Sequence, residues 1–313
     1  MGYHMTDQLA ACFILVSYNQ QDTVAEAAQA VLNQDCAPLQ IILSDDASTD
    51  RTFDILKELA DSYRGPHHVI ARQNRQNMGV NNHMSQAIEL AQSDFLIWSA
   101  GDDVSAPHRA RTILNAYNQT GAKLIYSDAH TRRPDASPGS ESYRKALFYN
   151  SRFTLDQAAV SFSLFLGAAV GWHKDLFSEY GGFPPQRAHE DLILGFRAAL
   201  EDSLHYIPEK LVTYREDVGV SSLLSNHAKN LDNKTRRRAV LTGQRTVLEQ
   251  RLKDAKTFGL VGDHPVCKAI SRLRDRIAMR LTYYEGGRTS YISQPIVLAH
   301  SLLSEWLRDI RDR

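Results

Sequence analysis

Two pairs of adjacent carboxylates stand out in this sequence as groups that could do chemistry. Asp102 and Asp103 follow directly on the hydrophobic run FLIWSAG, and Glu190 and Asp191 begin the stretch EDLILGFRAAL. Neighbouring carboxylates near a core repel each other unless water, hydrogen bonds or a cation takes up the charge. A divalent cation would do so, because hard cations prefer carboxylate oxygens. The alternatives are a solvated turn for the first pair and helix-dipole stabilisation for the second.

Other polar side chains follow hydrophobic runs in the same way. Ser17 and Asn19 end the run ACFILVSYN, Asp45 and Asp46 end LQIILSDD, and Asp128 ends KLIYSD. Continuous apolar runs of this length are typical of strands buried on both faces of a parallel sheet. Ligands of such sheets bind beyond the carboxyl ends of the strands. We therefore expect a ligand site at this edge rather than a set of solvated turns.

The elements that would position these residues alternate regularly. Hydrophobic runs predict strands over residues 11–19, 39–46, 67–73, 94–103 and 123–129. Helical patterns lie between them, over residues 22–34, 48–63, 79–92 and 106–121, and Gly121 would close the last of these. This alternation predicts an α/β fold with a doubly wound, mostly parallel sheet and right-handed crossovers.

The regular alternation ends near residue 130. Residues 131–144 are rich in Pro, Ser and Gly and predict an exposed loop, whereas the chain from about residue 226 is strongly helical. We expect an α/β domain over residues 9–225, with halves at 9–130 and 131–225, and a helical C-terminal extension over residues 226–313. The extension either packs as a lid or dimerisation element, which we favour, or touches a membrane.

Composition excludes several classes of protein. The 36 basic and 36 acidic residues balance, so no overall field favours nucleic acid or an anionic membrane. The three cysteines are far apart, which argues against structural zinc and a disulfide framework and fits a reducing cytosol. No signal peptide and no 18-residue apolar run is visible. We expect a cytoplasmic protein, with peripheral contact at the inner face of the membrane left open.

The segment ILSDDASTDRTFDIL resembles the nucleotide-binding segment of the family 2 inverting glycosyltransferases, which have a GT-A type, Rossmann-like fold. The resemblance continues in order over residues 11–222. The segments that carry it are ILVSYNQ, NMGVNNHMSQAIELAQSDFLIWSAGDDVSAP, GAAVGWHKDLFSEYGGFP, HEDLILGFRA and YREDVGVSS. It implies that residues 9–130 bind a nucleotide-sugar and that residues 131–225 bind the acceptor.

The resemblance implies a metal site at the first acid pair. The family's Asp-x-Asp element falls on Ala100-Gly101-Asp102, so its first acid is missing here. We therefore favour Asp102 as the ligand of Mn²⁺ or Mg²⁺. Asp103 would assist or orient it as a cofactor-binding residue. A divalent cation would neutralise the charge that grows on the leaving diphosphate. Asp103 could instead cap the helix that follows Pro107.

The resemblance implies a general base at the second acid pair, and we assign that role to Asp191, next to Glu190. Asp46 would lie under the base and ribose of the nucleotide, where a carboxylate can accept the N3–H of uracil. Asp45 is the alternative. Ser17 and Asn19 would line the same nucleotide pocket. We favour a helix N-cap for the following segment, residues 48–50.

A last segment, YREDVGVSS, implies that Tyr214 and Arg215 lie near the diphosphate, because a guanidinium offers forked hydrogen bonds to phosphate. Asp217 stands where many relatives carry a histidine, which puts a third metal ligand in doubt. The usual donor-side arginine is also absent, and Arg72 and Arg75 are weak candidates to replace it. Trp172 could stack on a sugar or pack in the core.

These observations lead to one main functional hypothesis. The chain is expected to be a metal-dependent inverting glycosyltransferase that moves a sugar from a nucleotide-diphospho-sugar, UDP-sugar favoured, to a hydroxyl of a glycan or lipid-linked acceptor. The expected setting is bacterial surface polysaccharide synthesis, and a homo-oligomer formed through the C-terminal helices is left open. The alternatives are an inactive nucleotide-sugar-binding module and a sugar nucleotidyltransferase, although FILVSYNQQDTV lacks the glycine-rich signature of the latter. An NAD-dependent dehydrogenase would need a GxGxxG after the first strand.

Overall fold

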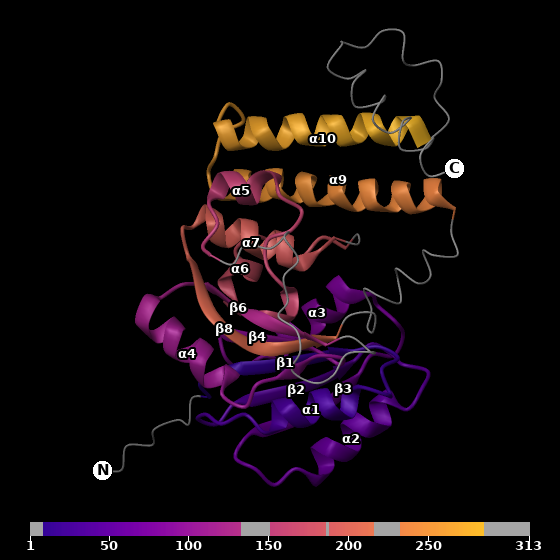
Figure 1. Cartoon of the computed structure of the whole chain (residues 1–313), viewed down its shortest axis with the longest axis vertical. Coiled ribbons are helices and arrows are strands. Elements are labelled where there is room, and N and C mark those ends of the chain that lie inside the picture. Colours follow the sequence, from indigo (N-terminus) through magenta and orange to yellow (C-terminus); the bar gives the residue numbers. More distant parts are fainter. Residues whose placement is uncertain (1–8, 133–150, 186–187, 216–231, 285–313) are drawn as a thin grey trace.

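One mixed sheet organises the residues that the structure describes, which are 9–132, 151–185, 188–215 and 232–284 of a computed structural model (Figure 1). The strands in these residues are β1 (Cys12–Ser17), β2 (Gln40–Asp45), β3 (His68–Gln73), β4 (Phe95–Ala100), β5 (Val104–Ser105), β6 (Leu124–Arg132), β7 (Val170–His173) and β8 (Leu204–Arg215). Their order across the sheet is β3-β2-β1-β4-β7-β6-β8-β5.

The sheet is parallel in its first half and mixed in its second. β1 pairs in parallel with β2 and β4, and β2 pairs in parallel with β3. β7 is antiparallel to both β4 and β6, β8 is parallel to β6, and the short β5 is antiparallel to β8. The predicted α/β, mostly parallel sheet is therefore confirmed. β6 runs three residues past the expected end at 129.

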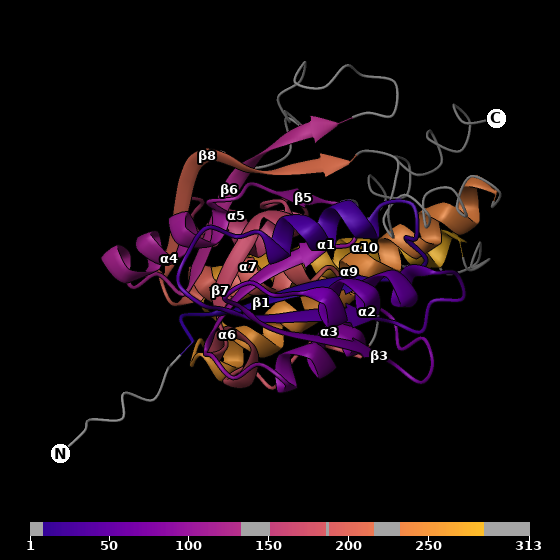
Figure 2. The same cartoon turned by 90° about the horizontal axis from the view of Figure 1, so that it is seen from below.

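Helices cover both faces of this sheet (Figures 1 and 2). They are α1 (Val24–Leu32), α2 (Thr52–Ser62), α3 (Val80–Glu89), α4 (Arg109–Thr120), α5 (Leu155–Val160), α6 (Asp175–Ser178), α7 (Glu190–Leu200), α9 (Asn233–Thr257) and α10 (Pro265–Tyr284), with a 3₁₀ turn at Gly167–Ala169. Successive β1 side chains point to opposite faces. Phe13 and Leu15 pack with α1, α2 and α4, whereas Cys12 and Ile14 share a core with α3, α5 and α7. The sheet is thus doubly wound, as predicted.

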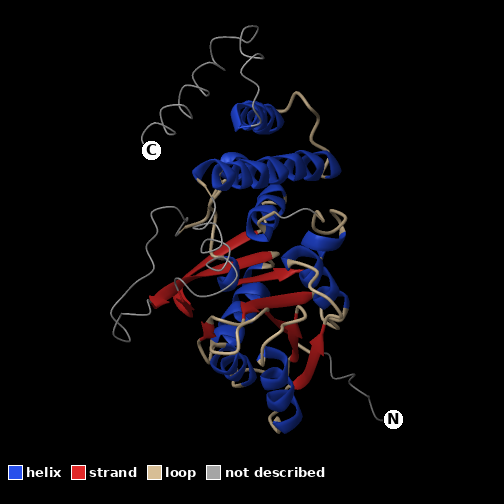
Figure 3. Ribbon diagram, turned by 90° about the vertical axis from the view of Figure 1, so that its right-hand side faces the viewer, coloured by secondary structure: helices blue, strands red, loops and turns tan. Residues whose placement is uncertain are grey.

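The helices α9 and α10 extend the second of these cores. Leu248 and Ile270 are fully buried in the same cluster as Ile14 of β1. An ion pair between Arg197 of α7 and Asp254 of α9 (Nε–Oδ2 2.9 Å) joins the helical layers. Figure 3 shows α9 stacked on the α/β part and α10 beyond it. The helical extension is present up to residue 284, and the domain boundary at 225/226 stays a prediction.

Helix termini test several sequence-based expectations. Gly121 ends α4 in the left-handed conformation (φ 66°), as predicted. The N-cap of α2 is Arg51, so the prediction of an N-cap within residues 48–50 is wrong by one residue. Asp50 precedes the N-cap and accepts the backbone N–H of Thr52 (2.9 Å). Asp103 does not cap α4, because that helix begins at Arg109 after His108. In the described residues, no helix has the length and apolar character needed to cross a membrane.

Candidate functional site

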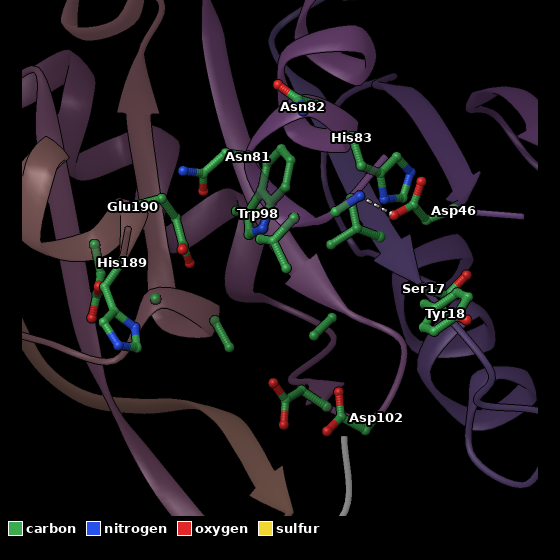
Figure 4. Close-up of a pocket in the computed structure, with 18 of the residues that line it drawn as sticks. Ser17, Tyr18, Asp46, Asn81, Asn82, His83, Trp98, Asp102, His189 and Glu190 are labelled. Carbon is green, nitrogen blue, oxygen red and sulfur yellow. Dashed lines mark hydrogen bonds between the residues drawn. The ribbon is translucent and has the colours of Figure 1, made fainter. Parts of the chain in front are cut away.

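A pocket of about 570 Å³ lies at the carboxyl ends of β1, β2 and β4 and is closed on its other side by the start of α7 (Figure 4). It brings together seven of the side chains that the sequence singled out, namely Ser17, Asp46, Asp102, Asp103, Glu190, Asp191 and Tyr214. Asn19, Asp45 and Arg215 do not line it. Ser17 and Tyr214, which are 197 residues apart in the chain, thus meet at one site. This agrees with the rule that ligands of such sheets bind beyond the carboxyl ends of the strands.

The first acid pair lies in the turn that follows β4. Asp102 and Asp103 are only 5% and 2% exposed. Asp102 Oδ1 accepts a hydrogen bond from Gln20 Nε2 (2.9 Å), and Asp103 Oδ1 accepts the backbone N–H of Arg215 (3.3 Å). Burial raises the pKa of Asp102 to about 6. Burial and the charge of Asp102 together raise the pKa of Asp103 well above its ordinary value. The surrounding residues therefore do not supply enough positive charge to stabilise both carboxylates in their ionised form.

Gly101 is what allows this turn to approach β1. A Cβ at position 101 would come within 2.5 Å of Gln20 Oε1 and 2.9 Å of Ser17 Cβ. Any side chain there would push the acid turn away from the strand end. The glycine therefore keeps Asp102 within reach of the amide of Gln20, a pocket-lining residue that the sequence analysis did not identify.

Two arginines lie close to the first acid pair without neutralising it. Arg109 is fully buried and donates to the carbonyls of Trp98 (2.7 Å) and Ala168 (2.7 Å), so its N–H groups are largely engaged with the backbone. Arg215 pairs with Glu26, while its Nη1 is buried without a hydrogen-bond partner among the described residues. That unpaired donor is suited to an anionic ligand.

The donor set at this turn fits a divalent cation shared with a ligand. In the ranges that the structure describes, no group of three or more His, Cys, Asp or Glu side chains is arranged to hold a metal. Two buried carboxylates with free oxygen lone pairs remain, at Asp102 and Asp103. Mg²⁺ is commonly held in this way, by one or two carboxylates together with substrate phosphates and water.

The second acid pair opens α7 on the opposite wall of the pocket. Glu190 and Asp191 are partly exposed to the cavity, and loss of hydration raises their pKa values to about 7 and about 6, with mutual repulsion adding to that of Glu190. Asp191 Oδ1 accepts the backbone N–H of Leu192 (2.8 Å). A Cβ on Gly167 would lie 3.2 Å from Glu190 Oε1, so the small residue keeps space beside the acids. Carboxylates with such pKa values can take up a proton near neutral pH.

Asp46 organises the loop between β3 and α3. Its Oδ1 accepts from Asn74 Nδ2 (2.6 Å) and the backbone N–H of Met78 (2.9 Å), and its Oδ2 accepts the N–H of Gly79 (3.0 Å). Gly79 precedes α3 with φ 73° and ψ 161°, a conformation that only glycine adopts readily. The carboxylate lines the pocket and keeps acceptor capacity on Oδ2, since each oxygen can take about two hydrogen bonds.

Asp45 and Asn19 hold the turn after β2 instead of lining the cavity. Asp45 Oδ2 accepts the N–H of Ser48 (2.8 Å) and Gln73 Nε2 (3.0 Å). Asn19 Oδ1 accepts the N–H of Thr49 (2.8 Å), and its own N–H reaches Ser48 Oγ (2.8 Å). Their side chains tie this turn to the end of β1. A direct contact of either with a nucleotide stays a prediction.

His83 is a pocket residue whose role the sequence did not indicate. It lies on α3 beside Asp46 (Figure 4), is 3% exposed, and its Nε2 is 2.6 Å from Ser44 Oγ. Burial lowers its pKa to about 4, so the ring is neutral at physiological pH. Its only sequence signal was its place four residues after Gly79 in a helix expected at the site. Arg72 also bonds Ser44 Oγ (2.9 Å) but does not line the cavity.

Burial decides between the two predicted roles of Trp172, and position separates two nearby histidines. Trp172 is fully buried, so it packs in the core and offers no face to a sugar. His173 contacts Asp175 (3.2 Å) outside the pocket, whereas His189 lines it beside Glu190. Asp217 lies outside the described residues, as does nearly all of the expected exposed loop.

Comparison with known proteins gives one family match. The family model described as "Glycosyl transferase family 2" matches residues 12–176, slightly more than half of the chain. EpsE of Bacillus subtilis is 34% identical over 96 residues, which are 31% of this chain and 34% of EpsE. Abequosyltransferase RfbV of Salmonella typhimurium is 28% identical over 118 residues, 37% of this chain and 34% of RfbV. The alignments thus span about a third of these relatives.

Solved structures extend the likeness of fold to most of the chain. TarS of S. aureus, solved with UDP-GlcNAc, superposes with a TM-score of 0.60 at 14% identity, covering 90% of this chain and 76% of TarS. The mannosyltransferase PcManGT of Pyrobaculum calidifontis, solved with GDP-Man and Mn²⁺, gives a TM-score of 0.55 at 15% identity, covering 96% of this chain and 80% of PcManGT. At these identities the likeness concerns the fold alone.

Proposed function

This chain belongs to glycosyl transferase family 2, and from that premise we propose that it transfers a sugar from a nucleotide-diphospho-sugar to a hydroxyl group of a glycan or lipid-linked acceptor. One observation carries the proposal: two partly protonated acid pairs, one after β4 and one at the start of α7, face a single pocket from different sides. A transferase of this kind needs one group to stabilise the negative charge of the leaving diphosphate and another to deprotonate the acceptor hydroxyl.

The donor half of the proposal rests on the β1, β2 and β4 ends. Asp46 and Ser17 would contact the nucleoside, and Tyr214 and Arg215 would lie toward the diphosphate. A uridine nucleotide is favoured because the neighbouring TarS structure contains UDP-GlcNAc, although PcManGT contains GDP-Man. Both neighbours therefore support a donor that carries a nucleoside diphosphate. Titration with different nucleotides would identify the base.

Asp102, assisted by Asp103, would hold Mn²⁺ or Mg²⁺ together with the donor diphosphate. When bound there, the cation would supply Lewis-acid stabilisation of the charge that develops on the leaving group. PcManGT was solved with Mn²⁺, which supports this choice of ion class. Gln20 would keep the Asp102 carboxylate oriented through its 2.9 Å hydrogen bond.

Asp191 would act as the general base. Its carboxylate, ionised above a pKa of about 6, would accept the proton of the acceptor hydroxyl as that oxygen attacks the anomeric carbon. Direct displacement by the acceptor, from the side opposite the diphosphate, would invert the configuration at that carbon. Glu190, with a higher pKa of about 7, would be protonated more often and could donate a hydrogen bond beside the base.

The setting of the reaction follows from the relatives. RfbV is named as an abequosyltransferase, and a further relative in Escherichia coli is named as a glucosyltransferase acting on a diphosphoundecaprenol-linked sugar. We infer that this chain works in the synthesis of a bacterial polysaccharide or related glycan, at the cytoplasmic side where nucleotide-sugars are available.

Calorimetric titration of UDP, GDP and dTDP, each with and without Mn²⁺, tests the donor site. Metal-dependent binding of one nucleotide, followed by slow hydrolysis of the matching nucleotide-sugar, would support the proposal. Binding of a nucleotide-sugar without hydrolysis or transfer to any acceptor would favour an inactive binding module. No binding of any nucleotide by folded protein would refute the donor-site assignment.

A further inference from the structure

The helices α9 and α10 concentrate the positive charge of a chain whose formal net charge is zero. Together they contain 13 of the 36 lysines and arginines but only three of the 36 acidic residues. The rest of the chain is correspondingly acidic. This separation of charge gives the molecule a basic pole on the side of the sheet covered by α7.

The cations of this pole are also paired less often than those of the α/β part. In the α/β part, exposed cations such as Lys57 and Arg111 have carboxylate partners, Asp61 (2.7 Å) and Asp35 (2.6 Å). On the two helices, the acids are already engaged by Arg245, Arg274 and Arg197. Among the residues with a described placement, six exposed cations on these helices have no ion pair: Arg238, Lys253, Lys256, Lys268, Arg272 and Arg276.

Three of these cations form a stripe along α10. Lys268, Arg272 and Arg276 are spaced four residues apart, so they lie on one face of the helix. The opposite face carries the buried side chains Ile270 and Ile277, which pack into the core. α10 is the outermost helix in the described part of the chain (Figures 1 and 3). Because the stripe lies opposite the buried face of α10, it points away from the rest of the fold. Like charges at this spacing destabilise a helix slightly, and an anionic partner would relieve their repulsion.

The turn that leads into α10 adds exposed apolar surface. Phe258 and Val261 are 44% and 66% exposed, next to Lys253 and Lys256 at the end of α9. Asp263 is the one acid in this turn. Apolar side chains flanked by lysines are suited to the boundary between lipid headgroups and acyl chains. A nucleic acid would instead be held in a basic groove with aromatic platforms, whereas the outer side of a single helix is convex.

We propose that the outer side of α10, together with the 258–264 turn, is a docking surface for an anionic lipid bilayer. The stripe of Lys268, Arg272 and Arg276 contacts the phosphate groups of the lipids, and the aliphatic stems of these side chains lie along the helix. Phe258 and Val261 enter the interface at one end. The surface does not depend on the proposed transferase activity, since it lies outside the pocket.

Vesicle co-sedimentation of the whole chain, without nucleotide, tests this surface. Vesicles of phosphatidylcholine alone are compared with vesicles that contain about 30% phosphatidylglycerol, an anionic lipid that gives the vesicle surface a negative potential. Binding is expected only to the anionic vesicles and should weaken steeply between low and high salt, because screening shortens the reach of surface charge.

The triple variant Lys268→Glu, Arg272→Glu, Arg276→Glu should bind the anionic vesicles roughly 100-fold more weakly, from about 1 kcal/mol for each basic residue at such a surface. The matched control reverses three exposed cations on or beside α2, on the other face of the sheet: Arg51→Glu, Lys57→Glu and Arg64→Glu. It changes the net charge equally and should bind like the unmodified chain.

Circular dichroism tests whether each variant is folded. If the triple variant unfolds, the single variant Arg272→Glu replaces it. That variant is expected to bind the anionic vesicles about five- to tenfold more weakly than the unmodified chain. Equal loss of binding in the α2 control would show that only net charge matters and would overturn the proposal. So would undiminished binding by the stripe variant, absence of binding to anionic vesicles, or tighter binding to duplex DNA than to lipid.

Discussion

Arg251 of α9 lies behind Asp191 at the start of α7, fully buried, and its Nη2 donates to the carbonyl of Leu192 (3.4 Å). Nη2 also donates to the carbonyl of Ser161 (2.8 Å), and Nη1 donates to the carbonyl of Ala159 (3.2 Å). Nε is buried without a hydrogen-bond partner among the described residues. The positive charge of Arg251 lowers the pKa of Asp191, against the larger upward effect of burial. A helix outside the α/β sheet therefore positions and tunes the proposed base.

Replacing Arg251 should change the pH profile of transfer. Asp191 must be ionised to accept a proton, so the rate should fall as the pH drops below about 6, its pKa. Arg251→Met removes the charge that lowers this pKa and should move the acid limb upward by roughly one pH unit. Arg251→Lys keeps the charge and should leave the limb nearly in place. Initial rates from pH 4.5 to 9 measure both.

Arg197 provides the matched control, because it is also fully buried but pairs with Asp254. Arg197→Lys should alter stability without moving the acid limb. The charge of Arg251 acts on Asp191, and the charge of His189 acts on Glu190. Because the two carboxylates are adjacent, the pH profile reports the pair Glu190–Asp191. An unchanged pH profile in folded Arg251→Met would remove the tuning role and leave Arg251 with a packing role alone.

Asp191→Asn should strongly reduce transfer while leaving donor binding intact. The amide keeps the shape of the side chain and its acceptor oxygen for the N–H of Leu192, but it cannot take up a proton. A loss of about 10²- to 10⁴-fold in kcat is expected for a missing general base, with nucleotide Kd changed less than about twofold. Glu190→Gln should lose less. A larger loss for Glu190→Gln than for Asp191→Asn would transfer the role of base to Glu190.

The sequence predicted the strand and helix order of the α/β half well because its strands are continuous apolar runs bounded by polar ends. Cys12–Ser17 and Gln40–Asp45 are buried along nearly their whole length, which makes the pattern unambiguous. The antiparallel strand Val170–His173 was not predicted. It is four residues long and contains a glycine, so neither length nor periodicity separated it from a loop.

The site could be predicted only to the level of strand ends. Asp45 and Asp46 are adjacent in the sequence, yet one holds a turn and the other reaches the pocket, because successive residues leave a strand in different directions. Gln20 and His83 were missed because neither an amide in the loop after β1 nor a histidine within a helix forms a distinctive pattern. Arg251 could not have been found, since its 60-residue separation from Asp191 is closed only by the packing of α9 on α7.

Asp102→Asn should stabilise the protein when no ligand is bound. The pKa of Asp102 is raised in the fold to about 6, so the folded state binds its proton more tightly than the unfolded chain. The stability of the unmodified chain should therefore fall as the pH rises from about 4 to about 6, and the variant should escape this loss. At pH 8 the gain is expected to be about 1 to 3 kcal/mol.

Urea unfolding of both proteins in EDTA, at pH 4 and pH 8, measures this difference, which should be small at pH 4. Addition of Mn²⁺ with the bound nucleotide should reverse the order of stability, because only the unmodified chain gains binding energy from the ion. An Asn variant that is less stable than the unmodified chain at pH 8 would show that Asp102 contributes structurally through its contact with Gln20.

Gly79→Ala should weaken both the fold and the nucleotide site. The backbone of Gly79 has φ 73° and ψ 161°, a region nearly restricted to glycine, and an alanine held there is expected to cost about 1 to 3 kcal/mol. Apart from Gly79 and its two chain neighbours, no residue has an atom within 4 Å of the new Cβ, so the cost is conformational and not steric. Relief of the strain would turn the N–H of Gly79 away from Asp46 Oδ2, and nucleotide affinity should fall with it.

Gly243→Ala is the matched control for this substitution. Gly243 lies inside α9, also with no atom within 4 Å of the added Cβ, but with helical backbone angles. Alanine there should raise stability by about 0.5 to 1 kcal/mol, since it reduces the freedom of the unfolded chain and favours the helix. The two variants add the same methyl group, so opposite changes in urea midpoint isolate the backbone conformation as the cause. A Gly79→Ala protein as stable as the unmodified chain, with unchanged nucleotide affinity, would show that this loop accepts another conformation and that Asp46 does not need the N–H of residue 79.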